Sequence, residues 1–173
     1  MPGSVVQINI SKGGVPKLPI AEARVTRLGI EGDGHAHPEF HGGPKQALLW
    51  ICEEAIDELK ALGYPLYAGA LGENLTTRGV DRRGLRIGQR WRIGEIAIEL
   101  TKVREPCRTI QRYGWDIGTA VYDRSVASGD WTSPRWGLSG FYASVVQPGF
   151  LHVGDAVSLL DAPVHGALVD APA

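Results

Sequence analysis

The sequence is poor in features that would fix its class at once. Only two cysteines, Cys52 and Cys107, occur among 173 residues, which excludes the disulfide framework of a small secreted domain. The longest apolar run, Ala47 to Cys52, is too short to cross a bilayer, and the first residues do not resemble a signal peptide. We therefore expect a cytoplasmic protein without a membrane partner, in a reducing compartment where a thiol stays available.

An excess of one charge and the familiar nucleotide motifs are also missing. The 18 basic and 19 acidic residues leave a net charge of −1, whereas a general nucleic-acid binder should carry a basic stripe. There is no Gly-x-Gly-x-x-Gly after a strand, no P-loop and no Gly-x-Ser-x-Gly elbow. These absences argue against a nucleic-acid partner, a nucleotide-binding fold and a serine hydrolase.

The remaining composition is that of a globular domain. Hydrophobic residues make up 43% and charged residues 21%, and the length suits one domain. We assign 1–160 to that domain and expect the tail, 161–173, to fray because it is rich in alanine, proline and glycine. The 23 glycines and 11 prolines lie mostly between short apolar stretches, which indicates short strands joined by tight turns.

Alternating apolar and polar residues predict half-buried strands. One such strand should bury Val6, Ile8 and Ile10 and turn Gln7 and Asn9 toward water. The same alternation recurs at Ile96, Ile98 and Leu100, and again at Val157 and Leu159.

Helical spacing occurs in two places. From Pro44 to Leu62, apolar residues recur every three or four positions, and Gly63 suits the end of such a helix. Cys52 would pack within it. A weaker helical region is expected from Cys107 to Val126, interrupted at Gly114 and Gly118. The predicted fold is mainly β with some α: a small β-barrel with one long helix and a shorter helical segment.

Cys107 follows a predicted strand in the sequence Arg104-Glu105-Pro106-Cys107-Arg108. Two neighbouring arginines would favour the thiolate, which is the form that attacks electrophiles or binds a metal. A buried cysteine that acts as a small hydrophobe is the alternative, and the residues alone leave the two readings open.

The segment from Gly32 to Pro44 contains three of the five histidines. Its end, His41-Gly42-Gly43, leads into the predicted long helix, whose free N–H groups would bind an anion with help from Lys45. A phosphate-bearing cofactor would fit there. A zinc or iron site and a plain polar loop stay open as alternatives. The metal site would use Asp33, His35, His37 and His41.

A third polar segment runs from Gly72 to Thr77. Glu73, Asn74 and Thr76 supply an acid, an amide and a hydroxyl, which are groups that orient a ligand rich in heteroatoms. The composition is also common in turns, so its meaning depends on what lies beside it.

These segments together resemble the MOSC family, which is named after the C-terminal part of molybdenum-cofactor sulfurases, and in particular its small stand-alone bacterial members. The matching motifs occur in the family's order along nearly the whole chain: Gly29-Ile30-Glu31-Gly32-Asp33, His41-Gly42-Gly43-Pro44-Lys45-Gln46-Ala47, Gly72-Glu73-Asn74-Leu75-Thr76-Thr77, Ile87-Gly88, Arg104-Glu105-Pro106-Cys107, Gly140-Phe141-Tyr142, and Gly149 with Val153-Gly154-Asp155. Ser144 stands where related members often have arginine. The stretch between Tyr113 and Trp136 matches nothing in the family, so it either forms a variable wall or packs.

The resemblance implies a β-barrel that binds the molybdenum cofactor (molybdopterin), a pterin dithiolene with a terminal phosphate. It places the molybdenum ligand or sulfur carrier at Cys107, where a soft thiolate suits the role. Asp33 and Glu73 would relay protons. The expected cofactor-binding residues are His41, Gly42, Gly43, Lys45, Asn74, Thr76 and Arg104.

The function that follows is an oxidoreductase that reduces N-hydroxylated compounds, such as hydroxylaminopurines. The sequence has no flavin or iron–sulfur signature, so a separate electron-donor protein would be the partner. The alternatives are a persulfide or cofactor carrier that uses Cys107, and a hydrolase with a histidine-bound metal. Whether the chain forms a homodimer stays open.

Overall fold

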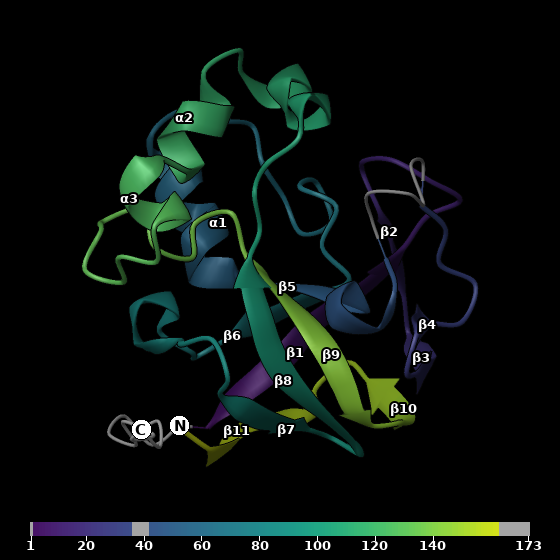
Figure 1. Cartoon of the computed structure of the whole chain (residues 1–173). Helices are drawn as coiled ribbons and strands as arrows, with labels where there is room; N and C mark the ends of the chain where they lie inside the picture. Colours follow the sequence, from purple (N-terminus) through teal and green to yellow (C-terminus); the bar gives the residue numbers. More distant parts are fainter. Residues whose placement is uncertain (1, 36–41, 163–173) are drawn as a thin grey trace, which may run out of the picture.

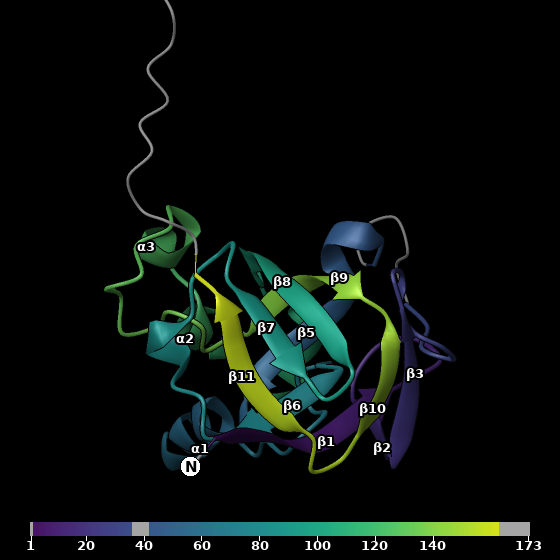
Figure 2. The same cartoon turned by 90° about the horizontal axis from the view of Figure 1, so that it is seen from below.

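The computed structural model describes residues 2–35 and 42–162, and seven of its strands close into a barrel (Figure 1). Seen from below, these strands form a ring (Figure 2). Their order around the barrel is β11 (Ala156–Asp161), β7 (Arg90–Ile93), β8 (Ile96–Val103), β9 (Phe141–Gln147), β5 (Leu48–Cys52), β6 (Leu75–Arg78) and β1 (Gly3–Ile10). Pairing of β1 with β11 closes the ring, and β5 with β6 is its parallel pair. The predicted mainly β, closed architecture is thus confirmed.

Four further strands lie outside the closed ring. β2 (Leu18–Ile20) extends the barrel sheet from β1. A separate small sheet contains β3 (Glu22–Thr26) between β4 (Gly29–Ile30) and β10 (Gly149–His152). None of the described helices is long and apolar enough to cross a membrane.

The barrel interior is an apolar core in which Ile8, Trp50, Leu75, Ile98 and Phe141 are almost fully buried. The predicted alternation is confirmed in β8, where Ile96, Ile98 and Leu100 are buried in the barrel core.

The alternation predicted for the first strand is wrong in detail. The pairing register of β1 shifts between Val5 and Gln7, so Val5 and Ile8 enter the core. Asn9, expected in water, is fully buried because the chain before β6 covers it. Its carbonyl accepts a hydrogen bond from Asn74 Nδ2 at 3.2 Å.

The long helix predicted from Pro44 begins nine residues later. Residues Pro44–Gln46 form only a 3-10 turn, η1, followed by β5, and the helix itself is α1 (Glu53–Ala61). Every residue of β5 is buried because the barrel core covers one face and helices cover the other. Such a continuous apolar run also matches a helical period, which explains the error. The predicted stop after the helix is confirmed, since Gly63 has a φ of +99°.

Helical segments cover the outer face of β5. They are α1, η3 (Arg108–Tyr113) and α2 (Ile117–Val121), which share a second apolar cluster with Ile51. The short helix α3 (Arg124–Ala127) follows them and buries Val126 in the apolar cluster of the barrel. The predicted weaker helical region is confirmed as a broken series with a break at Gly114. The second break is not at Gly118, which lies inside α2, but at Tyr122, and Asp123 then caps α3 by accepting a hydrogen bond from Val126 N at 2.9 Å.

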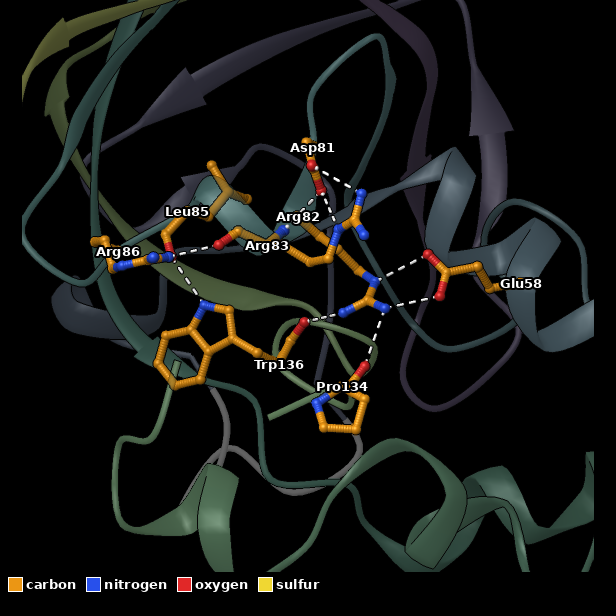
Figure 3. A network of polar contacts seen from close by, with 8 residues as sticks. All are labelled: Glu58, Asp81, Arg82, Arg83, Leu85, Arg86, Pro134 and Trp136. Atoms are coloured by element: carbon orange, nitrogen blue, oxygen red, sulfur yellow. Dashed lines mark hydrogen bonds and ion pairs between the residues drawn. The ribbon is translucent and has the colours of Figure 1, made fainter. Parts of the chain in front are cut away.

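A buried arginine ties this helical layer to the barrel (Figure 3). Arg82 in η2 (Arg82–Gly84) donates to Glu58 Oε2 of α1 at 2.7 Å, to the Pro134 carbonyl at 3.0 Å and to the Trp136 carbonyl. The Trp136 indole donates to the Leu85 carbonyl at 2.8 Å. Trp136 therefore packs, and these hydrogen bonds hold the end of the segment between Tyr113 and Trp136 in place. The predicted frayed tail lies outside the described residues from 163 onward.

Candidate functional site

A pocket of about 260 Å³ opens beside the barrel. Its wall comes from six places in the sequence: the loop after β1 near Lys17, the turn at His35, Gly42 with η1 and β5, the stretch from Leu71 to Asn74, the stretch from Arg104 to Thr109, and Tyr142 in β9. Small-molecule sites usually measure about 300–1,000 Å³, so this pocket is near the lower end of that range.

Cys107 reaches the pocket because the chain leaves the sheet just before it. The backbone N–H of Arg104 still donates to the Gly140 carbonyl at 2.9 Å, whereas Pro106 has no N–H to donate. Cys107 then precedes η3 in extended backbone geometry. Its thiol is partly exposed, and Sγ lies 2.6 Å from Thr109 Oγ1.

The two cysteines differ in acidity. Partial burial opposes ionisation of Cys107, but hydrogen bonding with Thr109 and the charge of Arg104 outweigh it, so the pKa of Cys107 lies below its ordinary value. Burial instead raises the pKa of Cys52 to about 12. Cys52 thus packs as predicted, although at the end of a strand, and Cys107 has the surroundings of a reactive or metal-binding thiol.

Arg104 is the clearest sign of a ligand. Its side chain lines the pocket although it is only 4% exposed. Nη2 donates to the Leu71 carbonyl at 3.0 Å, but Nε and Nη1 have no hydrogen-bond partner among the described residues. Buried polar groups are nearly always paired, and a guanidinium pairs best with anions. An anionic ligand that reaches this side chain would supply a partner for the guanidinium.

Asp33 lies behind the pocket wall. Its carboxylate accepts hydrogen bonds from Lys17 Nζ at 2.5 Å, from Asn74 Nδ2 at 2.7 Å and from the backbone of Ser11 at 3.0 Å. Lys17 and Asn74 line the pocket and Asp33 does not, so the predicted Asp33 reaches it only through them. Asn74 is held further because its Oδ1 accepts from Leu49 N at 3.1 Å.

Glu73 and Thr76 are also set back from the pocket. Glu73 Oε1 accepts from Gly69 N at 2.5 Å and from Thr76 Oγ1 at 3.1 Å, while Oε2 has no partner among the described residues. Burial raises the pKa of Glu73 and outweighs these hydrogen bonds and the charge of Arg104. The sequence therefore predicted residues that support the site as well as residues that form it.

The expected anion site at a helix N-terminus is not present. Gly42 lines the pocket, but Gly43 and Lys45 are exposed outside it, and a single 3-10 turn follows them in place of the predicted helix. His37 and His41 lie outside the described residues. Within the part of the chain that the structure describes, no three potential metal ligands cluster, so nothing there favours the zinc or iron alternative.

Several pocket residues were not selected by sequence reasoning, among them Lys17, Thr109 and Tyr142. Lys17 follows a Gly-Gly-Val-Pro turn that carries no recognised motif, and Thr109 stands two residues after the cysteine. Tyr142 lies in a family motif but received no role. Only the folded structure shows that these residues line the same pocket as Cys107.

The fold agrees with the comparisons to known proteins. Residues 37–158 match the MOSC domain family, and because this is more than half of the chain, the protein belongs to that family.

Among its relatives, the chain is 31% identical to the protein YiiM of Escherichia coli over 132 residues, which cover 74% of this chain and 54% of YiiM. It is 29% identical to a protein named "Reductase" from Gibberella moniliformis over 141 residues, or 78% of this chain and 23% of that protein. The crystal structure of YiiM from Geobacillus stearothermophilus superposes with a TM-score of 0.69 at 24% identity, covering 95% of this chain and 78% of that one, which supports the fold. The chain spans only about half of the E. coli protein.

Proposed function

We propose that the pocket binds the molybdenum cofactor and that the protein reduces N-hydroxylated compounds, such as hydroxylaminopurines. The observation that carries the proposal is the presence, in one pocket, of a thiol of lowered pKa and a buried guanidinium, two of whose nitrogens have no hydrogen-bond partner within residues 2–35 and 42–162. The relative named a reductase supports an oxidoreductase.

The residues of the pocket fit this cofactor chemically. A thiolate at Cys107 is a soft ligand suited to molybdenum. Arg104 and the neighbouring Arg108 would meet the anionic parts of the pterin dithiolene and its phosphate. The side-chain amide of Asn74 is held by Asp33, Asn9 and Leu49, so Asn74 would fix the shape of the wall. When bound, the cofactor supplies the two-electron redox couple of the reaction.

The overall reaction breaks one N–O bond. R–NHOH takes up two electrons and two protons and gives R–NH₂ and water. A separate electron-donor protein would supply the electrons, and the cytoplasm would keep Cys107 reduced. Lys17 Nζ is a proton-bearing group in the pocket wall, and Asp33 positions it through the 2.5 Å contact. Glu73, whose raised pKa favours a protonated carboxyl, is the proposed proton store behind the wall.

Turnover of a hydroxylaminopurine with a reduced viologen dye as electron source tests the proposal. The Cys107→Ala variant should fold normally, as judged by its melting temperature, and should reduce no substrate. Full activity in that variant would exclude Cys107 from the chemistry and with it this mechanism.

A sulfur or cofactor carrier is the second candidate, since the same partly exposed thiol of lowered pKa also suits a persulfide. Mass spectrometry of the native protein separates the two. A labile adduct of one sulfur atom on Cys107, without molybdenum and without turnover, favours the carrier.

A further inference from the structure

His35 forms part of the pocket wall, and its place depends on Gly42. A Cβ atom added at Gly42 would lie 2.8 Å from His35 Nε2 and 2.9 Å from Cδ2, which is closer than real Cβ atoms come to other atoms. The imidazole therefore occupies the space that any side chain at position 42 would need. Both residues line the same pocket as Cys107.

The ring nitrogens of His35 are available to a ligand. Within residues 2–35 and 42–162, neither nitrogen has a hydrogen-bond partner. Partial burial and then the charge of Lys17 lower the pKa of His35, against the opposing charge of Asp33. The other titratable groups that line the pocket are Arg104, Cys107, Arg108 and Tyr142. At neutral pH the ring is uncharged, so one nitrogen donates and the other accepts.

This pair of functions distinguishes His35 from the cationic side chains of the wall. Lys17 and Arg104 offer only hydrogen-bond donors, which suit an anion. A neutral imidazole also needs a donor from its ligand. An N-hydroxyl group supplies both an O–H donor and an oxygen acceptor, whereas the corresponding amine has lost the oxygen.

We propose that His35 binds the N-hydroxyl group of the substrate and so sets the preference of the pocket for an N-hydroxylated compound over the matching amine. This inference rests on the proposed function. A site that hydrogen-bonds a hydroxyl discriminates strongly against an analogue that lacks it, because its own polar groups are then left unpaired.

The test measures binding without turnover. Protein from a host that makes the molybdenum cofactor is assayed for molybdenum. Its dissociation constants for a hydroxylaminopurine and for the matching aminopurine are then measured by calorimetry in the absence of an electron donor. The wild-type protein should bind the hydroxylamine more tightly, and His35→Leu should reduce that preference by about tenfold. The His35→Gln variant keeps a hydrogen-bond donor and an acceptor, so it should retain the preference for the hydroxylamine at neutral pH.

The pH dependence separates recognition from a merely structural role. Protonation removes the acceptor nitrogen of His35, so the wild-type preference should fall as the pH drops through the pKa of His35, which lies below the ordinary value of 6.5. The His35→Gln variant should show no such fall, since its amide does not titrate. If the glutamine variant falls with pH as the wild type does, the proposal is wrong, even if the leucine variant does not fold.

Two adjacent glycines give a matched control. Gly42 and Gly43 have φ values of +89° and +85°, so alanine is similarly strained at either position, but a Cβ at Gly43 meets no atom within 4 Å. Gly42→Ala should therefore weaken the preference for the hydroxylamine over the amine more than Gly43→Ala does. Equal preference in all variants of a molybdenum-containing protein would overturn the role of His35. Absence of both molybdenum and turnover in the wild type would instead overturn the proposed function.

Discussion

Cys52 and Cys107 carry the same thiol, but the chain places them in opposite surroundings. Cys52 is packed in the barrel core, whereas Cys107 lies in a pocket next to a hydroxyl and a guanidinium. The sequence indicated this difference through the two arginines around Cys107. It could not show the contact with Thr109, which depends on the 3-10 geometry of η3.

Thr109→Val should raise the pKa of Cys107, because valine has the same shape but cannot hydrogen-bond to the thiolate. The alkylation rate of Cys107 with iodoacetamide, followed by mass spectrometry across pH, should show its midpoint at a higher pH than in the wild type. Thr119→Val in α2, an exposed position, is the control and should leave the midpoint in place. An unchanged midpoint in Thr109→Val would show that the hydroxyl does not stabilise the thiolate.

Glu73→Gln should change how stability depends on pH. Folding raises the pKa of Glu73 above 4.5, so the buried carboxyl favours the folded state at low pH and costs stability as the pH rises toward its folded pKa. The wild-type unfolding free energy should thus fall, relative to the variant, by at most about 1.4 kcal/mol per pH unit above pH 4.5. Urea unfolding at several pH values measures the difference. An unfolding free energy that depends on pH in the same way in both proteins would contradict the prediction.

Among the elements, β5 and α1 show where periodicity alone misleads. Leu48, Ile51, Ala55 and Leu59 fit one helical stripe, yet the first two belong to a strand and the last two to a helix. The deciding factor is the apolar cluster that buries the second face of β5, and part of it, including Ile110, Ile117 and Val121, comes from beyond position 107. The predicted anion site failed for the same reason, because it depended on a helix that starts after the strand.

Arg82 in η2 joins α1 to the turn that contains Pro134 and Trp136, and its loss should destabilise the fold. Arg82→Met leaves the Pro134 and Trp136 carbonyls without their donor and should lower the unfolding free energy by about 2–4 kcal/mol. Arg83→Met is the matched control, since the adjacent Arg83 is exposed and pairs only with Asp81 in its salt bridge, and it should cause no measurable change. Urea denaturation measures both, and equal stability of the two variants would refute the anchoring role of Arg82.

For the whole molecule, closure of the barrel is a long-range property. β1 and β11 pair near the two ends of the chain, and the six stretches of the pocket wall are spread from position 14 to 142. Alternation in short stretches predicted strands but could not predict their order. The barrel and the position of Arg104 at the site could be predicted because the ordered motifs resemble a known family, whereas the places of Lys17 and Thr109 in the pocket required the structure.

The central claim is that Cys107 holds molybdenum in this pocket. Its most direct test is metal analysis by plasma mass spectrometry of the wild-type protein, Cys107→Ala and Cys52→Ala, all produced in a host that makes the cofactor. Molybdenum at about one atom per chain in the wild type and in Cys52→Ala, and its loss in Cys107→Ala, is the predicted result, because only Cys107 offers a pocket thiolate. Equal molybdenum in Cys107→Ala, or none in any of the three proteins, would contradict it.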